Sequence, residues 1–426
     1  MNSVVRSDDG PALTKDLALT TWGLFVGLAL LMAASGLFGT LLGVRSELKG
    51  LPTVVSSLIC ASYYLGFLVG SRATLDALGR VGHIRVFAAL ASLLSASMLA
   101  VGLVDSSAIW AFLRFVTGLC IAGQYVVAES WLNDLADNSN RGRLLAIYMV
   151  VTTGAYGIGQ LLLNTVDVRL ITGFAFCSVL TSLAVAPVAL SESSAPPVQR
   201  REHISLRELA KVVPTGVGSC WMVGLAHGAM TGMAAIYATR VGLSIGQTSL
   251  FVAAPMVGGV LLQWPISAAS DDVDRRAVGV AAAIGAVAAS ILLLLGPASS
   301  PMALVLMAVL GGMSYPLYSI AGAYTNDWVE PEQGNAAASQ LITLYGLGAI
   351  VGPFFAAGMM VVAGPSGFYW ALVAAHALIA AFLIYRMRAW RAPLAKRPWN
   401  EVSLPARAFF VPATVVAMGR RYRKAK

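Results

Sequence analysis

Residues 333–385 read QGNAAASQLITLYGLGAIVGPFFAAGMMVVAGPSGFYWALVAAHALIAAFLIY and contain no Asp, Glu, Lys or Arg. A single helix of roughly 50 residues would be about 75 Å long, whereas about 20 apolar residues suffice to cross one bilayer. The GPSG sequence at 364–367 interrupts the apolar run, and such Gly/Pro clusters mark turns. This stretch therefore predicts two transmembrane helices joined as a hairpin.

The same apolar character extends over most of the chain. Of the 426 residues, 58% are hydrophobic and only 12% are charged, which is too apolar for a soluble globular protein. Hydrocarbon cannot hydrogen-bond backbone groups, so membrane-spanning segments are helices or a closed β-barrel, and the continuous apolar runs lack the alternation of barrel strands. We expect an all-α integral membrane protein.

Charges and Gly/Pro clusters divide the chain into twelve predicted transmembrane helices. A second hairpin is expected in the uncharged run 277–326, where Gly296-Pro297 and Pro301 interrupt the apolar residues. The predicted helices are 17–44, 51–71, 86–104, 108–128, 144–163, 170–190, 214–239, 243–270, 277–295, 302–325, 335–363 and 367–385.

The predicted helices form two six-helix halves. The expected organisation is an N-terminal segment 1–16, a first half 17–190, a polar linker 191–213, a second half 214–385 and a basic tail 386–426. At an offset of 193 residues the halves match, which indicates an internal repeat and pseudo-symmetric halves. The matches are Gly118 with Gly311, Asn133-Asp134 with Asn326-Asp327, and Gly159 with Gly352.

The basic residues indicate how the chain is oriented. Most Lys and Arg fall on one side of the membrane if both termini are cytoplasmic, as the positive-inside tendency requires. We therefore expect a multi-pass protein of a bacterial inner (plasma) membrane. The net charge of +9 could suggest nucleic acid, but the basic residues lie in loops and the tail, so the expected partners are membrane lipid and a small-molecule substrate. We expect a monomer, with no nucleic acid, cofactor or metal.

Four motifs stand out along the chain: Arg114-Phe115-Val116-Thr117-Gly118, Glu129-Ser130 followed by Arg141-Gly142-Arg143, Gln263-Trp264-Pro265-Ile266 ahead of Asp271, and Tyr315-Pro316. With them the sequence resembles the major facilitator superfamily, and within it the YcaD-like bacterial transporters, over essentially all of 17–385. This resemblance implies two six-helix halves around a central cavity that is exposed to each side of the membrane in turn.

Arg114 is the only Arg, Lys, Asp or Glu well inside a predicted span. Charge within a membrane is expensive, so such a residue is functional by default. It could hold an anionic group of a substrate or respond to proton binding nearby; the alternative is a structural arginine that caps backbone carbonyls. Thr117 and Tyr125 share its helix face and are further candidates for binding.

Other candidates for substrate binding lie on the helices that the resemblance places around the cavity. A neutral His227 could bind substrate or accept a proton, or could be a hydrogen-bonded core histidine. Aromatic and amide side chains suit a partly aromatic solute, although each could instead be a packing or interfacial residue. These candidates are Tyr148, Tyr156, Tyr315, Tyr318, Gln340 and Tyr345.

Charged residues at the predicted cytoplasmic ends are candidates for gating. Ion pairs between loops could hold an outward-open state and release as the halves rock. The alternative is solvated pairs that contribute under about 1 kcal/mol. The candidates are Arg80, Glu129, Asp134, Arg141 and Arg143 in the first half, and Asp271, Arg275 and Asp327 in the second.

These features predict secondary active or facilitative transport of a small organic solute by alternating access. Proton coupling would need Glu129 or His227, and uniport remains open. A GxxxxGK[ST] phosphate loop is absent from the sequence, so ATP is not the expected driver. The alternative is an integral-membrane enzyme or sensor, but the spans lack the clustered His or acidic residues of a catalytic site.

Overall fold

The computed structural model describes residues 15–135, 141–190, 204–330 and 333–389, and within these ranges the fold is helical, without strands. The helices and 3₁₀ segments are α1 (Lys15–Leu48), α2 (Thr53–Val81), α3 (His83–Leu103), α4 (Ser107–Leu135), α5 (Arg141–Leu161), η1 (Leu162–Thr165), α6 (Thr172–Leu183), α7 (Val185–Ala189), α8 (Leu206–Val212), α9 (Pro214–Arg240), α10 (Ile245–Asp272), α11 (Arg275–Leu295), α12 (Pro301–Ser314), α13 (Pro316–Asn326), α14 (Gly334–Ala363), η3 (Gly364–Ser366) and α15 (Gly367–Ala389).

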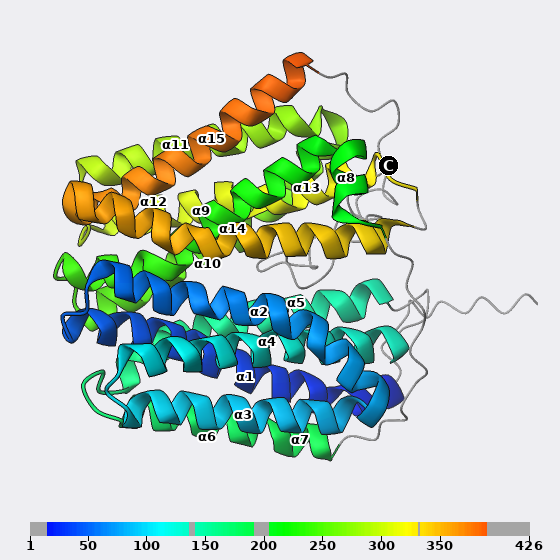
Figure 1. The fold of residues 1–426 in the computed structure, drawn as a ribbon, viewed down its shortest axis with the longest axis vertical. Coiled ribbons are helices and arrows are strands. Elements are labelled where there is room, and N and C mark those ends of the chain that lie inside the picture. Colours follow the sequence, from blue (N-terminus) through cyan, green and yellow to red (C-terminus); the bar gives the residue numbers. More distant parts are fainter. Residues whose placement is uncertain (1–14, 136–140, 191–203, 331–332, 390–426) are drawn as a thin grey trace, which may run out of the picture.

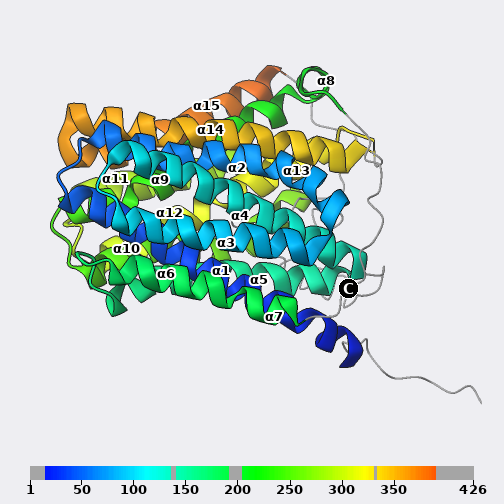
Figure 2. The ribbon, with the colours of Figure 1, turned by 60° about the horizontal axis from the view of Figure 1, so that its bottom comes forward.

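The helices lie in two groups, which are seen apart in Figure 1 and overlap in the turned view of Figure 2. α1 to α7 form the first group, in the lower part of Figure 1, and α8 to α15 form the second group above it. The groups meet where α2 packs against α14, α1 against α9, and α5 against α10. We call the end that carries residues 49–52, 104–106 and 241–244 the outer end, and the opposite end the inner end.

Both predicted hairpin breaks are confirmed. α11 ends at Leu295 and α12 begins at Pro301, where the Ser300 hydroxyl accepts a 3.2 Å hydrogen bond from the Ala303 amide and caps the new helix. α14 and α15 pack against each other on either side of η3. Gly364 has a φ of +64°, a conformation that favours glycine and reverses the chain.

The described part of the chain contains nine segments that are long and apolar enough to cross a membrane. The number is ten if α8 and α9, which are bent by 115° at their junction, are taken together. Ala336–Ala389 counts as one of these segments although it folds back at η3, and α5 is not among them. The fold is therefore that of an all-α membrane protein. The number of twelve spans remains a prediction, as does the division of the chain into five segments.

Repeat-related glycines make equivalent helix contacts in the two groups. A Cβ atom on Gly118 of α4 would lie 1.9 Å from the Tyr63 carbonyl oxygen of α2. Gly311 of α12 faces α10 in the same way, at 2.1 Å from the Pro255 oxygen. Real Cβ atoms essentially never approach another atom within 3.0 Å, so both helix pairs require glycine.

A second pair of glycines repeats this correspondence. A Cβ on Gly159 of α5 would lie 2.0 Å from the Ala33 oxygen of α1, and one on Gly352 of α14 would lie 2.4 Å from the Leu225 oxygen of α9. The packing of α4 on α2 and of α5 on α1 thus matches that of α12 on α10 and of α14 on α9. The internal repeat is a repeat of helix packing as well as of sequence.

Candidate functional site

A cavity of about 60 Å³ lies between the two helix groups and has room for a few water molecules. Residues from α1, α2, α4 and α5, with Met98 of α3, line it on one side, and residues from α9, α10 and α14, with Tyr315, line it on the other. Most of the lining is apolar, aromatic or hydroxyl-bearing. Arg114 is the only Asp, Glu, Lys, Arg or His among the lining residues that the structure describes.

The Arg114 guanidinium lies against two aromatic rings of the first group. Its central carbon is 4.7 Å from the ring centroid of Tyr63 and 5.4 Å from that of Phe38, within the range of cation–π attraction. Its Nε atom is buried and has no hydrogen-bond partner within the described ranges. The alternative of an arginine that caps carbonyls therefore finds no supporting hydrogen bond in this part of the chain.

Two residues on the face of Arg114 lie at different depths. Thr117 lines the cavity, and its hydroxyl donates a 2.8 Å hydrogen bond to the Arg114 carbonyl. Tyr125 lies farther along α4, where its hydroxyl donates to the Met32 sulfur at 3.2 Å. Its ring contacts Tyr148, which is fully buried, and neither tyrosine belongs to the lining.

The opposite wall carries Tyr315 and Tyr345, with His227 directly behind them. His227 Nε2 lies 3.2 Å from the Ser314 carbonyl oxygen, so it carries the hydrogen and donates. Nδ1 then accepts from the Tyr345 hydroxyl at 3.1 Å. His227 is 1% exposed with both ring nitrogens paired, which is the geometry of a hydrogen-bonded core histidine.

Of the remaining predicted binding residues, one lines the cavity and two do not. Tyr156 lines the cavity from α5. Tyr318 lies behind the wall, with its ring 5.2 Å from that of Tyr345. Gln340 lies away from the cavity, because its amide donates a 2.9 Å hydrogen bond to the Ile204 carbonyl ahead of α8. The cavity thus brings together Arg114, Thr117, Tyr156, Tyr315 and Tyr345.

An ion pair joins the two helix groups at the outer end. Arg240, the last residue of α9, donates to both carboxylate oxygens of Glu47, at 2.8 and 2.7 Å, and to the Thr53 hydroxyl at 2.9 Å. The side chains of Arg240 and Glu47 are only 23% and 18% exposed. This bidentate arrangement is the strongest type of side-chain ion pair.

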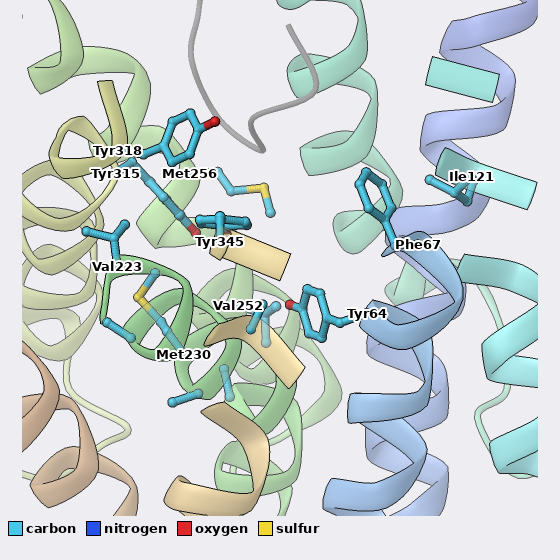
Figure 3. Packing of buried hydrophobic residues seen from close by; sticks show 14 of the residues in the cluster. Tyr64, Phe67, Ile121, Val223, Met230, Val252, Met256, Tyr315, Tyr318 and Tyr345 are labelled. Atoms are coloured by element: carbon cyan, nitrogen blue, oxygen red, sulfur yellow. The ribbon is translucent and has the colours of Figure 1, made fainter. Parts of the chain in front are cut away.

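Further hydrogen bonds join the groups between this ion pair and the cavity. The hydroxyls of Tyr64 and Thr231 are 2.5 Å apart, and the Cys60 thiol donates to the Gly232 carbonyl at 3.1 Å. Figure 3 shows Tyr64 extending from the first group toward Val252 of the second. All four of these residues line the cavity, on its side toward the outer end.

Among the described residues, α2 and α14 make only loose contacts toward the inner end. Arg72 of α2 donates to the Thr343 hydroxyl of α14 over 3.4 Å at an exposed position. This distance exceeds the usual limit of about 3.2 Å for a well-formed N–H···O hydrogen bond. A Cβ on Gly346 would be 3.7 Å from the Leu68 side chain, which is ordinary contact without interlocking.

The gating candidates of the second half form a buried cluster. Arg275 Nε lies 2.7 Å from Asp327 and Nη1 lies 2.9 Å from Asp271, and the side chains of Arg275 and Asp327 are 1% and 0% exposed. The alternative of a solvated pair does not fit this burial. All three residues belong to the second group, so these ion pairs join the ends of α10, α11 and α13.

The gating candidates of the first half are only partly described. Arg80 is exposed near the end of α2, and Glu129 is buried at 8% exposure in α4. The side chains of Asp134, Arg141 and Arg143 lie outside the described residues.

The sequence reasoning missed Glu47, Thr53 and Arg240, and the two rings that contact Arg114. Glu47 and Arg240 lie next to the ends of predicted helices on the same predicted side of the membrane. They are separated by 193 residues, the offset of the repeat. That coincidence was the signal that could have identified the pair.

The chain matches the family model described as Major Facilitator Superfamily over residues 24–239 and again over 216–421. The uncharacterized MFS-type transporter YcaD of Escherichia fergusonii is 28% identical over 339 residues, covering 79% of this chain and 88% of the relative. YcaD of Escherichia coli strain UTI89 has the same identity and coverage.

Two solved structures share the fold. The nucleoside transporter NupG (D323A mutant) superposes with a TM-score of 0.71 at 10% identity, covering 87% of this chain and all of that one (100%). A bacterial homologue of the human lysosomal transporter Spinster, in an inward-facing and occupied conformation, has a TM-score of 0.71 at 15% identity, covering 89% of this chain and 98% of that one.

Proposed function

Because the chain belongs to the major facilitator superfamily, whose matched members here are membrane transporters, we propose that it moves a small organic solute by alternating access. The observation that carries this proposal is the cavity between the two helix groups, which has a single charged lining residue, Arg114, within the described part of the chain. We propose no enzymatic activity, because the matched family and relatives are transporters.

The contacts around the cavity suggest which state of the cycle this structure represents. The Arg240–Glu47 pair and Tyr64 with Thr231 join the groups toward the outer end, whereas the described contacts of α2 with α14 near the inner end are loose. This asymmetry fits an inward-facing or occluded state. In the outward-facing state these outer contacts would separate, and the cavity of about 60 Å³ would widen to admit its solute.

The closing contacts have an energy suited to reversible opening. Hydrogen bonds to charged groups contribute about 1.5–3 kcal/mol each, and the partial exposure of Arg240 and Glu47 reduces that contribution. A pair of this strength can bias the equilibrium toward the closed outer end without fixing it there. Facilitative and proton-coupled transport both fit this cycle.

We also propose that the outer end faces away from the cytoplasm of a bacterium, with the chain in the inner membrane. The support is the concentration of Lys and Arg in the loops and tail of the opposite side. A C-terminal fusion to a fluorescent protein that matures only in the cytoplasm tests this orientation. A fluorescent fusion is expected. A dark but full-length fusion would mean that the chain has the opposite orientation.

Distances between spin labels test the transport cycle without knowledge of the substrate. Labels at the exposed residues Leu48 and Val241 report the outer end, and labels at the exposed residues Asp76 and Ser339 report the inner end. The labels are placed in a variant whose four cysteines, Cys60, Cys120, Cys177 and Cys220, are replaced.

Alternating access requires reciprocal changes in the two distances. Introducing Arg240→Ala should lengthen the outer distance and shorten the inner one in the same preparation. If both distances lengthen, the substitution only loosens helix packing, and if neither changes, the ion pair does not hold the outer end. Either result would contradict alternating access.

A further inference from the structure

The charge on the described lining of the cavity is positive, and it comes from Arg114. Arg114 makes no ion pair with an acid in the described ranges, and the lining residues in those ranges include no Asp or Glu. Glu129, the acid farther along α4, lies 15 residues away, about 22 Å along the helix. An unpaired charge inside a membrane protein costs free energy, and a bound anion offsets this cost.

The Arg114 guanidinium can bind a planar group, such as a carboxylate, through one of its edges. Phe38 and Tyr63 contact it through their rings, and its Nε has no partner among the described residues. An arginine offers parallel N–H donors along one edge, which match the two oxygens of a carboxylate. A lysine in this position would offer the charge without that paired geometry.

Space is available beside the guanidinium because position 39 is a glycine. A Cβ added to Gly39 would lie 4.0 Å from Arg114 Nη2 and 3.6 Å from the Tyr156 hydroxyl oxygen. The glycine of α1 therefore faces both polar groups without filling the gap between them. An oxyanion bound to Arg114 would lie within reach of the Tyr156 hydroxyl.

The second helix group supplies a wall of a different character. Met230, Val252, Met256, Tyr315 and Tyr345 line the cavity from this side, and Figure 3 shows them gathered opposite the first group. Methionine and tyrosine side chains suit an apolar or aromatic body, because thioethers adapt their shape and rings offer flat apolar faces. The cavity is therefore cationic on one side and apolar on the other.

We propose that the transported solute is an amphipathic organic monoanion whose carboxylate binds Arg114 and whose apolar or aromatic body packs on the second helix group. The inference rests on the proposed transport function and specifies its substrate class. Organic cations and zwitterions should bind more weakly, because their ammonium group would face a guanidinium of like charge with no acid among the described lining residues to pair with it.

Four probes of similar shape test this class by thermal unfolding of the full chain in detergent. They are 3-phenylpropionate, 3-phenylpropionamide, 3-phenylpropylamine and the zwitterion phenylalanine. A ligand that binds the folded state raises its apparent stability by mass action. Only 3-phenylpropionate is expected to raise the unfolding temperature of the wild type in a concentration-dependent way.

Three variants locate the effect. Arg114→Gln should weaken the apparent affinity for 3-phenylpropionate by roughly 10- to 100-fold, because charge-assisted hydrogen bonds are lost. The affinity of Arg114→Lys should lie between those of the wild type and Arg114→Gln. Gly39→Leu should block binding by filling the space beside the guanidinium. Gly358→Leu in α14 is the matched control, because a Cβ there meets no atom within 4 Å, and it should bind as the wild type does.

The outcomes separate the substrate class from the transport function. Equal stabilisation by the amide or the amine, or stabilisation by 3-phenylpropionate that survives Arg114→Gln, would overturn the proposed class. If the spin-label distances change reciprocally while no carboxylate binds, transport stands and the class fails. If 3-phenylpropionate binds through Arg114 but proteoliposomes do not take up its labelled form, the class stands and transport fails.

Discussion

The substitution Gly118→Ala should both destabilise the chain and disturb the cavity. Gly118 lies one helical turn beyond Arg114 on α4, and its backbone packs on the Tyr63 carbonyl of α2. Relief of the clash from 1.9 Å to the 3.0 Å that real Cβ atoms keep requires a local shift of about 1.1 Å. Gly66 of α2 makes the reciprocal contact, since a Cβ there would lie 1.8 Å from the Phe115 oxygen. The backbones on both sides of this contact leave no flexible side chain to yield.

The expected cost follows from two opposing effects. Overpacking of a tight interface costs about 1–3 kcal/mol, while replacing a helical glycine by alanine stabilises the helix by about 0.5–1 kcal/mol. The net loss should be about 1–2 kcal/mol, which for a chain of this length corresponds to roughly 1–2 °C in the unfolding temperature. The same shift would move the Tyr63 ring from its 4.7 Å contact with Arg114, so 3-phenylpropionate should bind more weakly.

Thermal unfolding in detergent, with and without 3-phenylpropionate, measures both effects. Gly157→Ala in α5 is the control, because a Cβ there meets no atom within 4 Å, so it should unfold at or slightly above the wild-type temperature. If Gly118→Ala unfolds together with this control and binds the probe equally well, the close approach of α2 and α4 does not hold the site in shape.

Three further substitutions address the other contacts. Arg240→Ala removes charge-assisted bonds to Glu47 and should shift the population toward an open outer end by roughly 10-fold or more, read from the Leu48–Val241 spin-label distance. Asp327→Asn removes the charge of one carboxylate that binds the buried Arg275, while Asp271 still binds it, and should cost about 1–3 kcal/mol, measured as a drop in unfolding temperature. Gln340→Ala should leave 3-phenylpropionate binding unchanged, because that amide bonds Ile204 away from the cavity, and weakened binding would contradict the lining described above.

The helical, membrane-embedded character of the chain could be predicted because it depends on local chemistry. Uncharged runs must be helical in lipid, and the Gly/Pro clusters at 296–301 and 364–367 mark where these runs turn. The ends of individual helices were less predictable. α1 spans Lys15–Leu48 against a predicted 17–44, because hydropathy ends with the hydrocarbon while helical hydrogen bonding continues beyond it.

The candidate site was predictable only where one residue carried the signal alone. Arg114 is conspicuous as a charge inside a span, and the structure places it in the lining. The tyrosines and Gln340 were chosen by residue type, and their position depends on which face of each helix meets the other group. The surroundings of His227 could not be predicted from the sequence, because its hydrogen bonds to Ser314 and Tyr345 join residues far apart in the chain.

The internal repeat explains both the closing contact and the one-sided charge of the cavity. Glu47 and Arg240 are separated by 193 residues, so they occupy equivalent positions of the two halves and meet each other. Identical residues at such a position would place like charges together, so the outer end can be held by an ion pair only because the halves have diverged to opposite charges there.

The same offset relates Arg114 to Met307, which is fully buried in α12. One half therefore contributes the cation and the other an apolar core residue at the equivalent position. Met307→Arg should leave the anion preference in place but lower the unfolding temperature, because α12 offers that charge no cavity. A Met307→Arg chain as stable as the wild type would mean that the asymmetry of the repeat does not determine where the cavity carries its charge.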